Sequence, residues 1–344
     1  SENVFMDSYN RISRLRPREL QGPLRVTFAG ERGIDAGGLT REWYHVISRE
    51  MFNANYGLFR ASPDGAFQPN PLSSVNPHHL LFFNFVGRVV GKALWDGEYL
   101  DAHFTRSFYK HILGQEVKLK DLESLDPDVY RSMCSMMEYD VDGLTFVAEY
   151  DEFGERHQVE LKPGGADIAV THDNKLEYVR LYVQYRLTKS IQAQLDAFVR
   201  GFHDLIPAEL VAPFSDSELE LLISGLPEID IDDLRAHTRY ETYTPSSPQI
   251  LWFWRVVEAL TREKARLLQF VTGSGKVPLG GFAALSSREE LRPFTIVRSG
   301  MTHSLPTSHT CFNQLDLPAY ESFDKLRKML LTALNEGCEG FGFS

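Results

Sequence analysis

The stretch SLPTSHTCFNQLDLP, residues 304–318, is the segment from which the fold and the chemistry of this chain are best worked out. It holds Cys311, one of three cysteines among 344 residues, two positions after a histidine. If the segment is extended, His309, Cys311 and Asn313 lie on one face, because side chains alternate along a strand. The two leucines that follow share that parity, so the predicted strand needs a shift of register just after Asn313.

Cys311 is a candidate nucleophile. A thiol is the most available nucleophile in proteins, because a few per cent is thiolate at neutral pH, and polar neighbours raise that fraction. The alternative is a small buried hydrophobe, which is how a free cysteine commonly behaves. That alternative suits Cys134, which stands among methionines, whereas Cys338 lies near the chain end and is interpreted as incidental.

Composition argues against several classes of function. The formal net charge is -11, from 36 basic and 47 acidic residues, which disfavours a nucleic-acid partner held through its phosphates and an anionic membrane surface. No apolar run is long enough to span a bilayer. Neither H-E-x-x-H nor paired Cys-x-x-Cys elements occur, and VTGSGKVPLGG departs from the phosphate-loop pattern at Val277. We therefore expect no metal and no cofactor.

Three widely spaced cysteines do not predict a disulfide framework, so we expect a reducing compartment, cytoplasmic and/or nuclear. The sequence does not begin with Met, and we interpret it as part of a longer protein with more chain upstream.

Periodicity and capping residues predict a largely helical chain with a β-rich insertion near 138–171. A helix carries Trp43 and Ile47, and Ser322 can cap the last helix. Further helices are predicted at 76–94, 101–113, 175–204, 215–224, 248–260, 262–271 and 323–336, and strands at 24–28, 293–297 and 311–317. At 344 residues two domains are expected, and composition leaves 224–230 and 243–249 open as the boundary.

Three of the seven methionines lie within five residues, in YRSMCSMMEYD at 130–140. Tyr130, Met133 and Met137 form one helical stripe. Either this stripe packs a core, or it forms an adaptable binding surface, which methionine supplies well.

Several motifs together resemble those of the HECT ubiquitin ligase family, in the order of that family and from about residue 5 to the end of the chain. They are DAGGLTREWY, FNFVGRVVGKAL, ELELLISGLPEIDIDDL, PQILWFW, LLQFVTGSGKVPLGGF and LPTSHTCFNQLDLPAYESFDKLRKMLLTALNEG. HFTRSFYKHILG and CFNQLDLPAYESFDKLR are most similar to the very large Mule-type members of the family.

The resemblance implies an α+β, bilobal fold. Residues 1–224 would form a mostly helical N-lobe, in which about 124–185 make a small α/β subdomain that binds the ubiquitin-conjugating enzyme. Residues 230–344 would form a smaller α/β C-lobe with the catalytic cysteine. The hinge between them would consist of Gly225, Leu226, Pro227, Glu228 and Ile229.

The resemblance also implies the chemistry. Cys311 would take ubiquitin from the conjugating enzyme as a thioester and pass it to a substrate lysine. His309 and Thr310 match the neighbours of the family's cysteine, Asp35 matches an N-lobe acid of the lysine step, and Phe341 matches a C-terminal phenylalanine that positions the C-lobe. The side chains matching the hydrophobic groove for the conjugating enzyme are Met133, Met137, Tyr139, Phe146 and Tyr182.

The implied partners are the conjugating enzyme, ubiquitin, and protein substrates bound mainly through regions upstream of this segment, with no nucleic acid and no membrane. Two alternatives stay open: a non-catalytic interaction module with the same fold, and a thiol hydrolase that uses His303 or His309 as its base.

Overall fold

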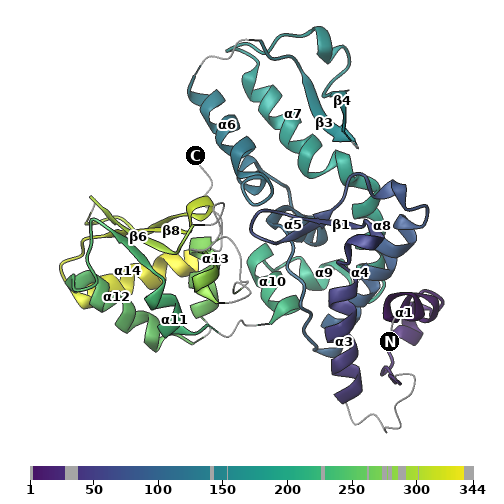
Figure 1. Ribbon diagram of the computed structural model, residues 1–344, viewed down its shortest axis with the longest axis horizontal. Helices are drawn as coiled ribbons and strands as arrows, with labels where there is room; N and C mark the ends of the chain where they lie inside the picture. The colour runs from purple at the N-terminus through teal and green to yellow at the C-terminus, as the bar shows by residue number, and fades with distance from the viewer. Residues whose placement is uncertain are drawn as a thin grey trace. The chain divides into compact units, whose positions relative to one another are not determined.

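The structure is a computed structural model that describes residues 3–27, 38–139, 143–152, 154–225, 229–261, 263–272, 277, 281–285, 292–300 and 302–336 (Figure 1). The chain forms two compact units, Ser1–Ile223 and Ser224–Ser344. Their boundary falls beside the predicted hinge, and the compositional alternative at 243–249 lies inside the second unit. Of the hinge, Gly225 and Ile229 are described, whereas Leu226, Pro227 and Glu228 lie outside the described residues.

The first unit is mostly helical. Its helices are α1 (Val4–Ile12), α2 (Pro17–Leu20), α3 (Gly38–Glu50), α4 (His79–Asp96), α5 (Arg106–Leu113), α6 (Pro127–Glu138), α7 (Lys175–Leu187), α8 (Gln192–His203), α9 (Ala208–Val211) and α10 (Asp216–Ser224), with short 3-10 turns η1 (Ala54–Tyr56), η2 (Ser73–Val75), η3 (Leu119–Leu122), η4 (Gly165–Asp167) and η5 (Lys189–Ile191). Two antiparallel ribbons join β1 (Phe59–Ala61) to β2 (Phe67–Pro69) and β3 (Val147–Glu152) to β4 (Glu155–Glu160).

The central pair of this unit is α4 and α8, whose backbones touch. A Cβ placed on Gly87 would lie 2.0 Å from the Phe198 carbonyl oxygen, and one on Gly201 would lie 2.0 Å from the Asn84 carbonyl oxygen. Only glycine permits so close an approach at these two points. The aromatic core closes around the pair, for example where Phe108 of α5 meets Phe198 edge to face at 4.8 Å between centroids.

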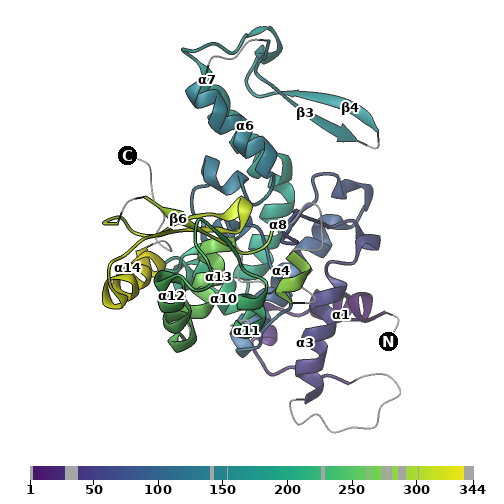
Figure 2. The same ribbon diagram turned by 60° about the vertical axis from the view of Figure 1, so that its left-hand side comes forward.

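A second, separate core supports the small subdomain. Its buried apolar side chains come from α6, α7, β3 and the segments that join them, with Phe146 and Tyr178 at its centre. Figures 1 and 2 both show α6, α7 and the β3–β4 ribbon grouped together and apart from α4 and α8. Asp126 begins α6, because its Oδ1 accepts from the Val129 amide at 3.1 Å and Pro127 fits the first helical position.

Three predicted elements of the first unit differ from the structure, and in the two helices a distant partner competes for the backbone. Residues 24–27 form no strand, and Leu24 and Val26 pack on the core of the first unit. The helix predicted at 101–113 begins only at Arg106, because residues 103–105 bond to Phe67 of β2.

The helix predicted at 175–204 is broken between α7 and α8. Thr188 leaves the helical region at φ -132° and ψ -65°. The Leu187 carbonyl accepts from His111 Nε2 at 2.9 Å instead of from an amide of a continuing helix.

The second unit packs helices against a four-stranded sheet. Its helices are α11 (Ile231–Ala236), α12 (Pro248–Ala259), α13 (Glu263–Thr272) and α14 (Phe323–Glu336), with turns η6 (Phe282–Leu285) and η7 (Thr310–Phe312). The strands β5 (Arg239–Glu241), β6 (Thr295–Ser299), β7 (Thr307–His309) and β8 (Gln314–Pro318) lie in the order β5-β6-β8-β7, and only β7 runs antiparallel to its neighbour. Ser322 caps α14 as expected, since its Oγ accepts from the Lys325 amide at 3.2 Å.

The contact between α4 and α8 makes a first prediction. Gly87→Ala should destabilise the chain by about 2 kcal/mol, because the added methyl group overpacks against a backbone carbonyl. Helix propensity alone would predict the opposite sign, a gain of about 1 kcal/mol. Urea unfolding followed by circular dichroism measures the difference.

Gly300→Ala is the control, because a Cβ there meets nothing within 4 Å. It should change the free energy of unfolding by less than about 0.5 kcal/mol. A Gly87→Ala chain as stable as the parent would contradict the backbone contact.

Candidate functional site

Cys311 lies in a tight reversal between two strands. β7 ends at His309, η7 follows, and Asn313 takes the left-handed conformation at φ 48° and ψ 40° before β8 begins. His309 is then paired across the hairpin with Gln314. The extended arrangement expected for this segment was therefore wrong.

The reversal also accounts for the shift of register that the sequence required. Leu315 and Leu317 belong to β8 and are buried in the core of the second unit. Their parity is set by that strand, on the far side of the turn from β7. The cysteine belongs to neither strand and stands in the turn, where η7 carries its backbone.

Several bonds fix the shape of this turn. The Asn313 amide donates to the Thr310 carbonyl at 3.2 Å, and the Asn313 carbonyl accepts from the Thr295 amide of β6 at 2.9 Å. Asn313 Nδ2 donates to the Arg292 carbonyl at 2.7 Å, while the Arg292 guanidinium lies 4.9 Å from the Phe312 ring centroid. A turn held from both sides presents its middle residue in one orientation of the backbone.

His309 has an orienting partner that sequence reasoning missed. Its Nε2 lies 3.1 Å from Asp316 Oδ2, and Gln314 Nε2 donates to Asp316 Oδ1 at 2.6 Å. A carboxylate only accepts, so Nε2 carries the hydrogen and Nδ1 is the free acceptor of the neutral ring. The signal was present in the sequence, because the antiparallel return of β8 brings Asp316 beside β7, but the turn had to be recognised first.

The other candidate groups are distributed as follows. Asp35 and Phe341 lie outside the described residues. Gly225, directly after α10, has a φ of 77°, a backbone conformation that residues other than glycine rarely adopt. His303, the other candidate base, has Nδ1 3.3 Å from Lys325 Nζ. Cys134 is a free, partly buried cysteine on α6.

The five side chains expected in the groove differ in exposure. Met137 and Tyr139 are 42% and 68% exposed, whereas Met133, Phe146 and Tyr182 are 5%, 0% and 9% exposed and belong to the core of the subdomain. The Met-rich stripe is thus core at Met133 and surface at Met137. Met133, Phe146 and Tyr182 are thus too buried for broad direct contact with a partner, and the groove for the conjugating enzyme stays a prediction.

The subdomain exposes two further apolar side chains that the sequence did not single out, Leu144 and Leu176. The Leu144 carbonyl accepts from the Val170 amide at 2.8 Å, and Lys175 Nζ, next to Leu176, donates to the Tyr139 carbonyl at 3.1 Å. Exposed apolar side chains in such numbers often mark an interaction surface.

Among the described residues, no three His, Cys, Asp or Glu side chains come together as a metal site. No helix in the described part of the chain combines the length and the hydropathy needed to cross a membrane.

Comparison with known proteins identifies the family to which the chain is similar. The HECT-domain (ubiquitin-transferase) family model matches residues 45–344. The chain is 52% identical over its whole length to E3 ubiquitin-protein ligase HUWE1 of Mus musculus, covering 8% of that protein. It is 50% identical over its whole length to E3 ubiquitin-protein ligase ptr1 of Schizosaccharomyces pombe, covering 11%, and 51% identical over 99% of its length to E3 ubiquitin-protein ligase UPL1 of Arabidopsis thaliana, covering 10%. The chain thus spans about a tenth of the length of the curated relatives it matches.

The split of the methionine stripe makes a second prediction. Met133→Asp should destabilise the subdomain by about 3 kcal/mol or more, because it leaves an unpaired charge in an apolar core. Met137→Asp should cost no more than about 1 kcal/mol, mainly from a carboxylate near a helix C-terminus. Thermal unfolding and hydrogen exchange of α6 and α7 measure both. Equal losses in the two variants would show that Met137 also packs the interior.

Proposed function

The chain belongs to the HECT-domain (ubiquitin-transferase) family, and from this premise we propose that it is the catalytic part of a HECT ubiquitin-protein ligase. It accepts ubiquitin from a conjugating enzyme as a thioester on Cys311 and transfers it to a substrate lysine. The observation that carries this proposal is the family match over residues 45–344, which includes the cysteine in its turn between β7 and β8.

The proposed reaction has two balanced steps. In loading, the Cys311 thiolate attacks the carbonyl carbon of the incoming thioester; a new C–S bond forms and the conjugating enzyme's cysteine leaves as a thiolate. In discharge, a neutral lysine amine attacks the same carbon; a C–N bond forms, Cys311 leaves as a thiolate and the amine loses a proton. Thioester exchange is close to balanced in energy, so the protein mainly supplies proximity and orientation.

The contacts around the turn support the assignment of His309 and Thr310. Asp316 holds the His309 ring by Nε2, which leaves Nδ1 able to accept a proton. The Thr310 carbonyl accepts from Asn313 and so helps to close the turn. His309 and Thr310 are proposed to help position the turn that carries Cys311, while Asp35 and Phe341 are proposed to act in discharge.

The exposed side chains of the subdomain support the proposed site for the conjugating enzyme. Met137 and Tyr139 offer apolar contacts over a core that contains Met133, Phe146 and Tyr182. The Met137→Asp variant extends the preceding test to function, because loss of loading with the fold intact would place the enzyme on this surface. Substrates are proposed to bind mainly through other parts of a longer protein, located in the cytoplasm and/or nucleus.

Two other functions can be separated by experiment. A non-catalytic module with the same fold would bind the conjugating enzyme without taking ubiquitin. A thiol hydrolase would release ubiquitin to water, and the pairing of His309 with Asp316 is the one observation that favours it. A ubiquitin adduct that persists without lysine and disappears when lysine is added supports the ligase alone.

The nucleophile makes a third prediction. With activating enzyme, a conjugating enzyme, ATP and ubiquitin, the chain should form an adduct on a non-reducing gel that thiols cleave. Cys311→Ala should abolish the adduct, because no other group replaces the thiolate. Cys134→Ala, the matched control on α6, should load at the parent rate. An adduct that survives in Cys311→Ala would refute the assignment.

The lysine step makes a fourth prediction. Asp35→Ala and Phe341→Ala should load Cys311 at the parent rate in a single-turnover pulse, because a thiolate attacks the thioester directly. Both should discharge slowly to lysine in the chase, and a lost acid/base group is typically worth about 10²–10⁴-fold. A variant that fails in the pulse, or that discharges at the parent rate, does not have the proposed role.

A further inference from the structure

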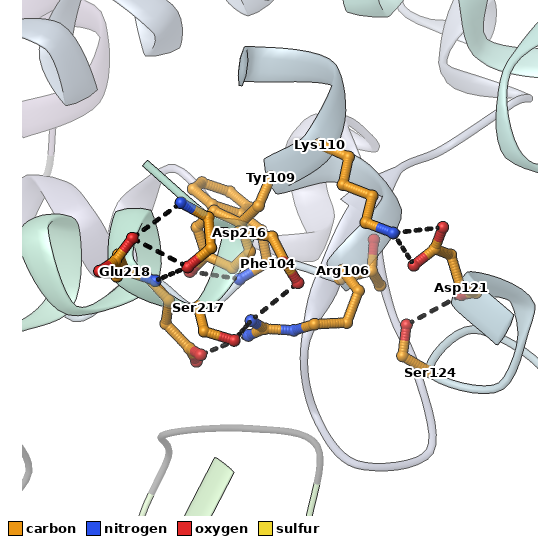
Figure 3. A network of polar contacts seen from close by, with 12 residues as sticks. Phe104, Arg106, Tyr109, Lys110, Asp121, Ser124, Asp216, Ser217 and Glu218 are labelled. Atoms are coloured by element: carbon orange, nitrogen blue, oxygen red, sulfur yellow. Dashed lines mark hydrogen bonds and ion pairs between the residues drawn. The ribbon is translucent and has the colours of Figure 1, made fainter. Parts of the chain in front are cut away.

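Arg106, the first residue of α5, holds α10 at two successive turns (Figure 3). Its NH1 lies 3.4 Å from Asp216 Oδ2 and 3.4 Å from Ser217 Oγ, and its NH2 pairs with Glu220. His103 Nδ1 lies 3.1 Å from the second oxygen of Glu220. One planar guanidinium thus spans the face of α10, which a single ammonium nitrogen would not match.

Both ends of α10 are fixed as well. The Phe214 carbonyl, just before the helix, accepts from Gln115 Nε2 at 2.9 Å. Near the other end the Ile223 carbonyl accepts from the Leu100 amide at 2.9 Å. The helix is therefore anchored to within two residues of Gly225, where the left-handed conformation begins the predicted hinge.

One turn further along α5, Lys110 reaches a different partner. Figure 3 shows it directed to Asp121 of η3, and its Nζ lies 2.8 Å from Asp121 Oδ1. The same carboxylate accepts from the Lys118 amide at 2.7 Å. The next residue, His111, donates from Nε2 to the Leu187 carbonyl at the end of α7, since a carbonyl only accepts. Burial lowers the pKa of His111, which suits a neutral donor.

Because burying a charge is costly, Arg106 and Glu220 must keep their positions relative to each other. Glu220 is 1% exposed and Arg106 is 14% exposed. Burial by itself would lower the pKa of Arg106, but attraction to Glu220 and Asp216 outweighs it and raises that pKa above the ordinary value. A buried charge tolerates displacement from its partner poorly, because the loss of attraction leaves the desolvation cost unmet.

We propose that Arg106 and Lys110 are positioning residues for ubiquitin transfer, with α5 serving as the common frame for two parts. Arg106 fixes the helix that leads into the hinge, and Lys110 fixes the root of the subdomain proposed to bind the conjugating enzyme. This inference rests on the proposed function, and it deepens that function by stating what sets the geometry of each step.

The two contacts should matter in different steps. Loading needs the conjugating enzyme and Cys311 to meet, so it depends on both the root of the subdomain and the hinge helix. Discharge to lysine takes place without the conjugating enzyme, so of these two parts it should depend only on the hinge helix. Arg106 should therefore act in both steps, and Lys110 in loading only.

Arg106→Lys and Lys110→Gln test this division. Each keeps a hydrogen-bond donor, and neither residue is placed at the nucleophile. Arg106→Lys should slow loading and discharge by about 10-fold each, whereas Lys110→Gln should slow loading by about 10-fold and leave discharge within about twofold, since misplacement by about 1 Å can cost about 10²-fold. Both rates are measured in single turnover at saturating conjugating enzyme, with its affinity measured separately.

Asp204→Asn is the matched control. It removes the carboxylate that pairs with Arg88 at 2.7 Å, and Arg88 is 13% exposed, much like Arg106. It should lower the unfolding temperature to a similar degree and leave both rates at the parent values. Hydrogen exchange should quicken in α10 for Arg106→Lys and not for the control.

The proposal is overturned if Arg106→Lys transfers at the parent rate, if Lys110→Gln slows discharge as much as loading, or if Asp204→Asn slows both steps. Should either variant fail to fold, Ser217→Ala and Asp121→Asn weaken the same two contacts and carry the same expectations. A parent chain that never loads Cys311 refutes the proposed function itself, which separates the two failures.

Discussion

The close contact of α4 with α8 is the constraint on which the first unit depends. Because Gly87 and Gly201 have no Cβ, the two backbones meet directly and form a body that can slide or tilt very little. α5 packs on this pair through Phe108 and Phe198. α1 is tied to it through Arg88, whose NH1 donates to the Ile12 carbonyl at 3.2 Å. The charged contacts of α5 are therefore made from a fixed base.

The first unit contains two separate hydrophobic cores. The core around α4 and α8 is built of many aromatic rings, whereas the subdomain has its own smaller core around Phe146 and Tyr178. Polar contacts between the two parts include Lys110 with Asp121 and His111 with the Leu187 carbonyl, beside the buried side chains of Leu122 and Leu187.

Local sequence signals predicted the elements whose structure is decided locally. α4 and α12 are rich in buried apolar residues, α14 carries an apolar stripe, and Ser322 caps α14 as its position indicated. The two helices whose bounds were predicted wrongly have a different explanation. Residues 103–105 bond to β2, and the break after Leu187 is fixed by His111, which is 76 residues away in sequence. Periodicity within a window contains no information about such partners.

In the candidate site too, some features could be predicted from the local sequence and others depend on tertiary structure. The motif located Cys311, but only the pairing of β7 with β8 shows that it stands in a turn and that Asp316 reaches His309. Helical spacing put Met133 and Met137 on one stripe, and only the packing of the subdomain separates the buried residue from the exposed one. Pattern identifies which residues are candidates, and tertiary packing decides what each can touch.

The placement of charge suits the proposed transfer, a reaction that is nearly neutral in energy. At the turn, His309 is half exposed and donates a hydrogen bond to a carboxylate that water can also reach, so this contact contributes orientation more than strength. Among the buried charges of the other unit, Glu220 lies on α10, the helix before the predicted hinge, and Arg106 of α5 pairs with it. A thiolate needs little further activation to exchange a thioester, but the two reacting groups must meet in good geometry. In the proposed transfer, buried charge therefore serves better to fix the frame than to alter the nucleophile, because the turn would have to admit two different partners in succession.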